Sequence, residues 1–189
     1  MRTFPILKAD VLIDNIGEEW QRESLLSQCA FHYENSPSMA NTNEGCWRSA
    51  FNYINADWLY KAVRDMVSIS LDSYLHADPS YKSRLSPKGY QIEHWTNINN
   101  PGSSNRIHSH VDFDFVALYF IQGEGTGELT FHNPANLLTN CSINAPFTSR
   151  MSYEPKDGDL LVWPAWMPHE VEINKSDKKR VNIAFNIKL

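Results

Sequence analysis

Two histidines and two aspartates occupy alternate positions in the segment 106–114. They are His108, His110, Asp112 and Asp114. If this segment is an extended strand, residues two apart project from the same face, so the four side chains point the same way. A buried strand face does not normally carry two imidazoles and two carboxylates, because uncompensated burial of such groups is costly. The face is therefore either exposed to solvent or bound to a cation.

A second segment favours the cation. Residues 155–171 contain a Gly-Asp turn, an apolar run, an aromatic corner bounded by prolines and then one histidine, His169. Two imidazoles and a carboxylate with open coordination positions form the usual ligand set of non-haem Fe(II) oxygenases. Arg180 follows His169 by eleven residues, and its planar guanidinium is suited to binding a carboxylate.

The elements that must position these residues are predicted to be strands. Short runs of about four to eight residues are bounded by Gly, Pro, Asn or Asp, which is typical of strands separated by turns. The expected strands cover residues 90–97, 106–112, 115–122, 127–131, 159–163, 169–173 and 180–187. No helix-length pattern lies between them, which argues against parallel strands joined by helices and favours an antiparallel sandwich, jelly roll or small barrel.

The region of the chain before the strands is predicted to be helical. Helices are expected over residues 14–29 and, most clearly, over residues 55–76, where apolar side chains recur every three or four residues. The apolar face of the second helix must pack on the strand region, so both helices are interpreted as an outer buttress. The sequence thus predicts one domain over 1–189, with a helical region (1–85) followed by a β region (86–189).

The charge and hydropathy of the sequence argue against two classes of function, nucleic-acid binding and membrane insertion. The 189 residues carry 17 Lys and Arg against 22 Asp and Glu, a net charge of −5, whereas a protein that binds nucleic acid normally shows a basic surface. The longest apolar stretch, residues 115–121, has seven residues, and a membrane span needs about 20. The first residues lack the apolar run of a secretory signal. We therefore expect a cytoplasmic protein that binds neither membrane nor nucleic acid, and the oligomeric state is left open.

The order of the motifs resembles the 2-oxoglutarate- and Fe(II)-dependent oxygenase superfamily, and within it the small oxygenases of marine bacteria and their phages. The resemblance covers residues 86–189. It rests on the His-x-His-x-Asp stretch at 108–112, Ala-Leu-Tyr-Phe at 117–120, Gly-Glu-Leu-Thr-Phe at 127–131, the run from Gly-Asp at 158–159 to Pro-His-Glu-Val at 168–171, and Arg180 with Phe185-Asn186. It implies a mostly β fold, the double-stranded β-helix (a jelly roll shared with cupins), with the N-terminal helices outside it.

The resemblance implies an iron site but leaves two ligand sets open. The superfamily's common pattern maps to His110, Asp112 and His169. Many members of the smaller group carry His-x-His followed by Pro, and Val111 and Asp112 follow here instead. The alternative set is therefore His108, His110 and His169, with Asp112 outside the ligands. The first set is preferred, because a carboxylate offsets the charge of iron and matches the commonest ligand set of these enzymes.

The resemblance also implies the co-substrate and the reaction. Arg180 would pair with the distal carboxylate of 2-oxoglutarate, and Asn182, on the same strand face, and Tyr119 are the further candidates for binding it. Oxidative decarboxylation would yield succinate and carbon dioxide while an unactivated C–H bond is hydroxylated. The substrate would be a small molecule or a protein side chain, and the sequence does not identify it.

A second interpretation is a cupin-like metal-binding protein or an enzyme that does not use 2-oxoglutarate. Gly102 followed by His108, His110 and Asp114 resembles the first cupin motif with Asp in place of Glu. Because cupins share the fold, the fold cannot separate the two readings. Arg180 can, since a cupin has no need of it. A structural or interaction domain without metal is the third reading.

Overall fold

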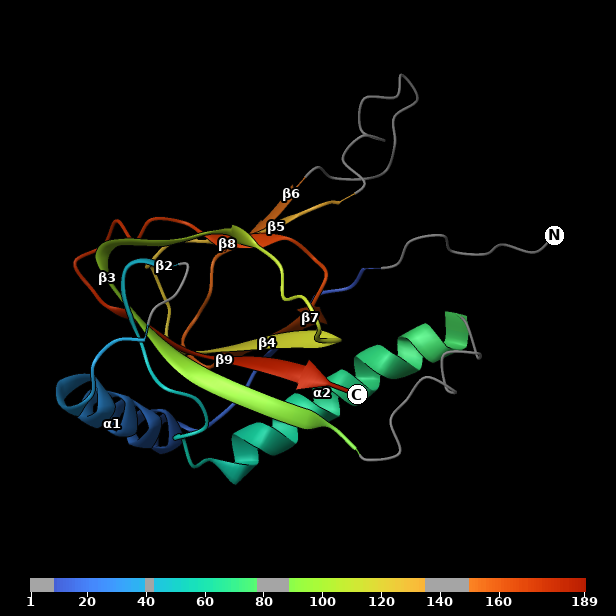
Figure 1. The fold of residues 1–189 in the computed structure, drawn as a ribbon, viewed down its shortest axis with the longest axis horizontal. Helices are drawn as coiled ribbons and strands as arrows, with labels where there is room; N and C mark the ends of the chain where they lie inside the picture. Colours follow the sequence, from blue (N-terminus) through green and yellow to red (C-terminus); the bar gives the residue numbers. More distant parts are fainter. Residues whose placement is uncertain (1–8, 40–42, 78–88, 135–149) are drawn as a thin grey trace, which may run out of the picture.

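The computed structural model describes residues 9–39, 43–77, 89–134 and 150–189. Within these residues, nine strands form one curled antiparallel sheet in the order β1-β7-β4-β9-β3-β8-β5-β6, with β2 paired to β3 (Figure 1). The strands are β1 (Leu12–Asn15), β2 (Asn43–Arg48), β3 (Gln91–His108), β4 (Phe115–Gln122), β5 (Leu129–His132), β6 (Arg150–Tyr153), β7 (Asp159–Pro164), β8 (His169–Val171) and β9 (Arg180–Lys188). The helices are α1 (Glu19–Asn35) and α2 (Asp57–Ala77).

The long strand β3 makes the sheet curl. Its residues 91–99 pair with β9, whereas Asn105 and His108 pair with β8. Between the two stretches lie Pro101 and Gly102, and Gly102 has a φ of +82°, a conformation that favours glycine. One strand therefore belongs to both layers, β1-β7-β4-β9-β3 and β3-β8-β5-β6, which lie one above the other in Figure 1. This is the double-stranded β-helix that the sequence predicts.

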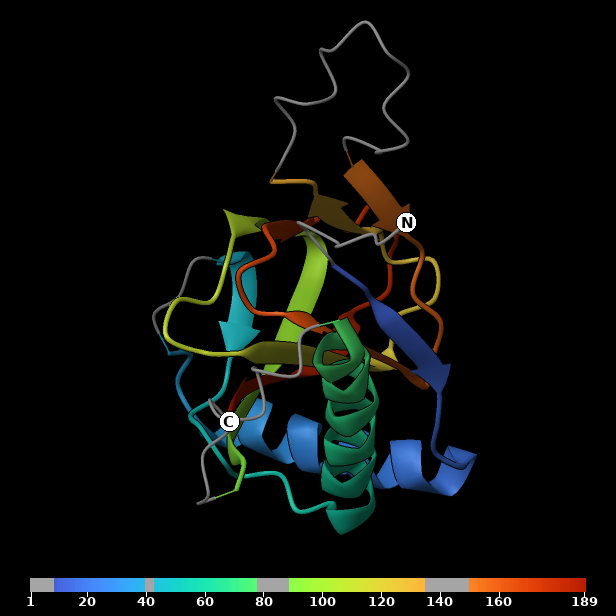
Figure 2. The same ribbon diagram turned by 90° about the vertical axis from the view of Figure 1, so that its right-hand side faces the viewer.

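Successive side chains of β4 point alternately into two separate hydrophobic cores. Val116, Leu118 and Phe120 are buried between the two layers. The alternate residues, among them Phe115 and Tyr119, are buried on the opposite face. That outer face carries the apolar side of α2, and Figure 2 shows the two helices crossing on this side of the sheet. The predicted buttress is therefore confirmed, and the interior between the layers remains for the candidate site.

The N-terminal half of the chain differs from the prediction in detail. α2 matches the expected helix over 55–76 to within two residues. α1 begins at Glu19 rather than at residue 14, because residues 12–15 pair with β7 as β1. The region predicted to be helical also contributes a second strand, since β2 pairs with β3. The predicted boundary at 85/86 lies outside the described residues. Neither described helix is long and apolar enough to cross a membrane.

The turn between β1 and α1 yields a stability prediction. Gly17 has a φ of +85°, and a Cβ there would lie 2.8 Å from Tyr119 Oη and 2.9 Å from the Trp58 ring. Gly125 has a similar φ of +74°, but a Cβ there would have nothing within 4 Å. An alanine at Gly125 would therefore meet only the backbone strain of a positive φ. Gly17→Ala should therefore lower the free energy of unfolding by about 1–3 kcal/mol more than Gly125→Ala. Urea unfolding of both variants measures this, and equal losses would contradict the proposed steric conflict.

Candidate metal centre

Three histidines from three segments converge at one end of the interior. His108 ends β3 and His169 begins β8, and the two residues are paired across the strands. His110 follows in the turn after β3, where its backbone N–H donates to the carbonyl of Ala165 at 2.9 Å. One ring nitrogen of each histidine lies within 4.8 Å of one from each of the others. Such a spacing is compatible with a shared metal ion.

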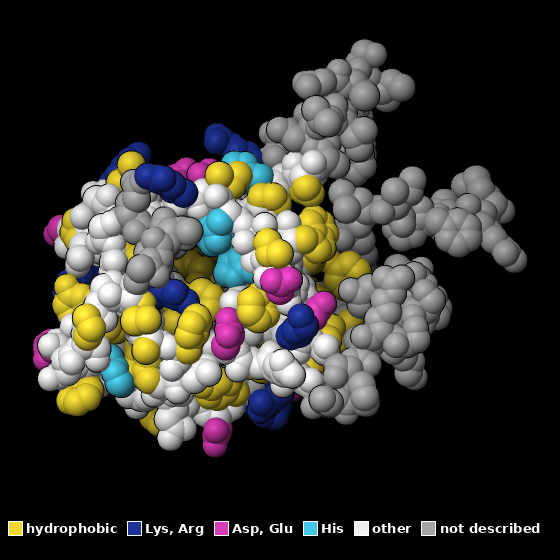
Figure 3. All heavy atoms as spheres, in the orientation of Figure 1, with side chains coloured by type: hydrophobic (Ala, Val, Ile, Leu, Met, Phe, Trp, Pro, Cys, Tyr) yellow, Lys and Arg dark blue, Asp and Glu magenta, His cyan; other side chains and the backbone are white. Residues whose placement is uncertain are grey.

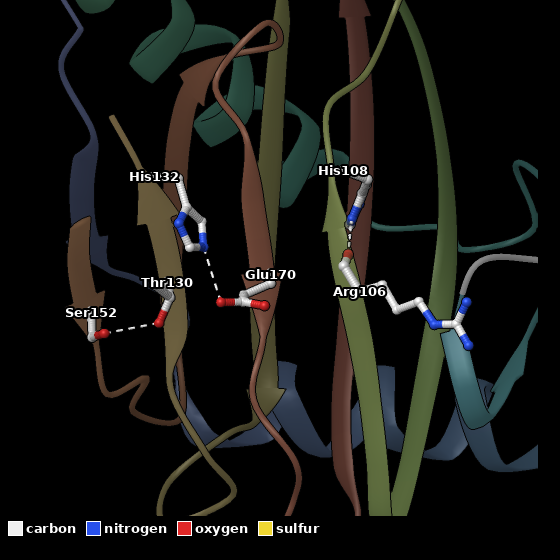
Figure 4. Close-up of polar contacts among 6 residues, drawn as sticks. All are labelled: Arg106, His108, Thr130, His132, Ser152 and Glu170. Carbon is white, nitrogen blue, oxygen red and sulfur yellow. Dashed lines mark hydrogen bonds and ion pairs between the residues drawn. The ribbon is translucent and has the colours of Figure 1, made fainter. Parts of the chain in front are cut away.

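Two of the rings have their tautomer set by backbone carbonyls. The Nδ1 of His108 lies 2.7 Å from the carbonyl of Arg106, and the Nδ1 of His169 lies 3.0 Å from that of Met167. Figure 4 shows the contact at His108. A carbonyl can only accept a hydrogen bond, so each Nδ1 carries the proton, and each Nε2 presents its lone pair. Metal-binding histidines are commonly oriented in this way.

The third ring is oriented through an amide. The carboxylate of Glu93 accepts a hydrogen bond from Nδ2 of Asn186 at 2.9 Å, which determines how the amide is turned. The Oδ1 of Asn186 therefore faces Nδ1 of His110, at 2.5 Å, and accepts a hydrogen bond from its N–H. His110 thus also presents its Nε2. Three imidazoles with the same free nitrogen form a preorganised set of neutral ligands.

The environment of the rings favours the neutral, metal-binding form. Burial lowers the pKa of His169 to about 3, and the neighbouring His108 acts in the same direction. Burial likewise lowers the pKa of His110 to about 4, while the hydrogen bond with Asn186 acts against it. Neither ring therefore holds a second proton near neutral pH, and no proton competes with a metal at these two positions.

Asp112 does not join this group. β3 ends at His108, and the chain turns at Val111 and Asp112. Asp112 has a φ of +74°, is exposed, and offers its backbone carbonyl to Lys188 Nζ at 2.9 Å. The strand predicted over 106–112 is confirmed only to His108, so the alternation that would align Asp112 with the histidines does not hold. Of the two candidate ligand sets, the one brought together is His108, His110 and His169.

The turn is held in place from both sides. Asp114 N–H donates to Ile187 O at 2.9 Å, and its carbonyl accepts from Ala165 N–H at 3.0 Å. Its carboxylate accepts the Leu189 N–H at 2.9 Å. Asp114, the last member of the alternating pattern, therefore anchors the turn between β9 and the β7–β8 connection, and so it positions His110.

A cavity of about 240 Å³ opens beside the three histidines. Its walls are mainly apolar and come from β3, β4, β5, β7, β8 and β9: Trp95, Val116, Leu118, Leu129, Trp163, Val171 and Ala184. Figure 3 shows histidine side chains at a hollow on this face, with hydrophobic side chains around it. Asn97, Asn105, Asn182 and Arg48 add polar groups. An apolar cavity with a few placed polar groups is typical of a small-molecule site.

The three residues predicted to bind the co-substrate lie in different environments. Asn182 lines the cavity and its Oδ1 accepts from Asn97 Nδ2 at 3.0 Å. Arg180, on the same face of β9, is fully buried and donates to the Thr126 carbonyl at 2.7 Å. Tyr119 points away from the cavity into the outer core, where its hydroxyl donates to Ile16 O at 3.2 Å. The expectation for Tyr119 is therefore wrong, since it has the opposite parity along β4 from Val116 and Leu118.

The guanidinium of Arg180 is buried but has no carboxylate partner among the described residues. Burial lowers its pKa to about 10. No carboxylate of the described residues forms an ion pair with it, and its Nε has no hydrogen-bond partner among them. Trp163 Nε1, on a wall of the cavity, is a second buried donor without a partner in the same described set. Unsatisfied buried donors are costly, so both donors are candidates for an acceptor that the described residues do not supply.

His132 stays outside the centre. Figure 4 shows it on β5, pointing toward Glu170 of β8, with a ring-to-carboxylate distance of 2.9 Å. Nearby, the hydroxyls of Thr130 and Ser152 lie 2.8 Å apart. These contacts tie β5 to its two neighbours. His132 thus contacts Glu170 rather than the three grouped histidines.

The amide at the centre yields a second prediction. Asn186→Ala removes the acceptor that fixes the tautomer of His110 without removing a ligand atom. Metal affinity should fall on the order of 10–100-fold, as for other residues that orient a ligand. Competition with a fluorescent chelator measures the affinity. Asn174→Ala, which removes a buried asparagine of the β8–β9 connection, controls for general loosening. An unchanged affinity in Asn186→Ala would show that His110 needs no orienting partner.

A family described as "Putative 2OG-Fe(II) oxygenase" matches residues 93–186, about half of the chain. The match includes the three histidines and Arg180, but neither helix. No curated protein matches the chain in sequence.

Solved structures of low sequence identity share the fold. A prolyl-4-hydroxylase of Pseudomonas putida has a TM-score of 0.64 at 16% identity, over 94% of this chain and 91% of that one. HygX of Streptomyces hygroscopicus, solved with nickel and 2-oxoglutarate, has a TM-score of 0.61 at 11% identity, over 94% and 82%. A prolyl hydroxylase of Trichoplax adhaerens, solved with a hypoxia inducible factor peptide, has a TM-score of 0.56 at 16% identity, over 94% and 83%. With the family match and the fold, the chain belongs to the 2-oxoglutarate- and Fe(II)-dependent oxygenases, a family of enzymes whose cofactors are Fe(II) and 2-oxoglutarate.

Proposed function

We propose that this chain is a dioxygenase that couples the oxidative decarboxylation of 2-oxoglutarate to the hydroxylation of a substrate C–H bond. The products are the hydroxylated substrate, succinate and carbon dioxide, so one oxygen atom of O₂ enters the hydroxylated substrate and the other enters succinate. The observation that carries the proposal is a triad of neutral histidines beside an apolar cavity, with a buried, unpaired guanidinium on the same strand face as Asn182. The substrate class is a small molecule or a protein side chain.

In this proposal the metal is held by Nε2 of His108, His110 and His169. The donor set suits Fe(II), because imidazole is a good ligand for this ion and three ligands leave positions open. Bound Fe(II) would supply the activation of O₂. The backbone carbonyls of Arg106 and Met167 and the amide of Asn186 keep the rings oriented. The turn anchored by Asp114 keeps His110 near the other two.

Arg180 is the proposed anchor for the distal carboxylate of 2-oxoglutarate. Its guanidinium is positively charged and fully buried, and charge-assisted hydrogen bonds to a carboxylate would satisfy its open donor. Asn182 and Asn97 lie on the polar side of the cavity and would orient the co-substrate. Leu118 and Trp163 contribute apolar walls to the cavity beside the histidines, and such walls exclude water from the site.

Binding and turnover test this function separately. Under anaerobic conditions, Fe(II)-loaded protein should bind 2-oxoglutarate, as measured by calorimetry. On admission of O₂, succinate should form from 2-oxoglutarate, slowly alone and faster with a suitable substrate. Protein without metal, or with the inert ion Zn²⁺, should form none. Fe(II)-loaded protein that binds no 2-oxoglutarate would disprove the proposal.

The all-histidine donor set gives a second candidate some support. Because no carboxylate of the described residues belongs to the group, the site also resembles a cupin-like metal centre that works without 2-oxoglutarate. The charge of Arg180 favours the oxygenase, since a fully buried guanidinium is costly unless an anion is bound. A cupin-like enzyme would bind Fe(II) but gain no stability from 2-oxoglutarate.

A further inference from the structure

Arg48 is the only Lys or Arg among the described residues that line the cavity. It ends β2 and is paired with Asn97 of β3, whose side chain also reaches the cavity. It lies before the segment of the chain that the family match covers. The proposed mechanism gives it no role, because Arg180 already provides a charge for the co-substrate.

Two aromatic rings hold the guanidinium of Arg48 in place. Its Cζ lies 4.6 Å from the centre of the Trp95 ring and 4.7 Å from that of Phe51. These rings are nearly perpendicular to each other, at 88°. A guanidinium placed over two aromatic rings is restrained by cation–π attraction, and neither ring offers a hydrogen-bond acceptor that would use up its N–H groups. The group is thus oriented before any ligand arrives.

No protein group of the described residues takes up the charge of Arg48. Within that set, its guanidinium forms neither an ion pair nor a hydrogen bond. Burial lowers the pKa of Arg48, and the charge of Glu93 only partly opposes this effect. Glu93 is meanwhile bound to Asn186 at 2.9 Å. The open N–H groups are therefore available to a ligand in the cavity.

The position of Arg48 relates it to the metal centre. Trp95 stacks on His110, with ring centres 6.1 Å apart and an angle of 19° between the planes. One aromatic ring thus separates the guanidinium from a proposed iron ligand. A group bound by Arg48 lies beside the reacting centre.

Apolar side chains are exposed on or next to the segments that carry the histidines. Ile107, Val111 and Trp166 are 54%, 76% and 43% exposed. Each adjoins one of the segments that carry the histidines, and hydrophobic side chains border the hollow in Figure 3. Exposed apolar groups around a site indicate contact with an apolar part of a ligand.

We propose that Arg48 binds a carboxylate of the primary substrate, whose apolar body extends past the three histidines to Ile107, Val111 and Trp166. The proposal rests on the oxygenase function and narrows its substrate class to apolar carboxylic acids. A monoanion is favoured over a phosphate, because one guanidinium matches one negative charge and the described cavity lining offers no second cation.

Matched acids and amides test this assignment. The probes are the straight-chain carboxylates from butanoate to decanoate, for a free acid, and N-acetyl-L-leucine and N-acetyl-L-phenylalanine, for a peptide C-terminus. Each is paired with its primary amide. Binding is measured by saturation-transfer NMR and calorimetry on Fe(II)- and 2-oxoglutarate-loaded protein without O₂. The variants are Arg48→Met and, as the control, Arg64→Met, which removes an exposed guanidinium from α2.

In the wild type and in Arg64→Met, at least one acid should bind about 10–100-fold more tightly than its amide. In Arg48→Met the acid should lose that advantage while Fe(II) and 2-oxoglutarate affinity stay unchanged. The series that shows the preference identifies a free acid or a peptide end. No preference in any pair, with or without binding, would overturn the inference while leaving the oxygenase function intact. Loss of 2-oxoglutarate affinity in Arg48→Met would overturn it too, by assigning Arg48 to the co-substrate. Wild-type protein that binds no 2-oxoglutarate would instead refute the oxygenase function.

Discussion

Replacing His169 with alanine should abolish stoichiometric Fe(II) binding and, with it, all turnover of 2-oxoglutarate. His169 is buried and lies against both of the other rings, whose centres are 4.4 Å and 5.2 Å from its own. Removing it deletes a ligand atom and leaves a metal only two nitrogens. The loss should exceed the roughly 10–100-fold that changes in orienting residues cost. Metal content after anaerobic reconstitution, measured by atomic emission, reports the result.

His132→Ala is the matched control. His132 lies on β5 next to β8, pairs with Glu170 rather than with the triad, and stands outside the metal group. Its replacement should leave one Fe(II) per chain. Full metal content in a folded His169→Ala protein would refute the proposed centre.

The same measurement decides between the two ligand sets. His108→Ala should lose Fe(II) as His169→Ala does, whereas Asp112→Ala should keep it. The reason is geometric, since Asp112 lies beyond the end of β3 at a φ of +74° and is exposed. Greater metal loss in Asp112→Ala than in His108→Ala would restore the His110, Asp112 and His169 set.

Arg180→Met should weaken 2-oxoglutarate binding by about 10–100-fold, the equivalent of losing charge-assisted hydrogen bonds. Methionine fills much of the volume but carries no charge. At a ligand concentration of 100 times the wild-type Kd, 2-oxoglutarate should stabilise the wild type by about 2.7 kcal/mol. After a hundredfold loss of affinity, this falls to about 0.4 kcal/mol. Thermal unfolding with and without the ligand measures the difference.

Metal binding separates this effect from damage to the fold. Arg180 is not among the grouped ligands, so Fe(II) affinity should persist in Arg180→Met. Arg180→Lys should keep some of the 2-oxoglutarate affinity, because the charge remains while the planar fork is lost. Equal 2-oxoglutarate affinity in wild type and Arg180→Met would remove the main reason to prefer the oxygenase over a cupin-like protein.

Much of the fold could be predicted because hydrophobic runs and turn residues act locally. β4, β7 and β9 lie close to the predicted strands, and their apolar runs are buried in the structure. β1 and β6 were missed because they are short and partly exposed. A four-residue edge strand gains its stability from its neighbour rather than from its own residues, so no local sequence pattern predicts it.

The site could be predicted only in part, for a similar reason. His108 and His169 meet because β3 and β8 pair, and this pairing is not encoded near either residue. The alternation argument assumed that the strand continued to Asp112, but the bonds between Asp114, Ala165 and Ile187 turn the chain first. Arg48 was overlooked because it precedes the expected strand region. Its aromatic partners give no signal in sequence.

The position of β9 has a consequence for how this chain acquires its fold. Among the described strands, β9 joins β1-β7-β4 to β3 and the strands beyond it. Until residues 180–188 have left the ribosome, β3 and β4 each lack a partner along an edge that is apolar in the finished protein. Such open edges invite pairing with other chains. We therefore expect aggregation during synthesis to begin at the edges of β3 and β4 that await β9.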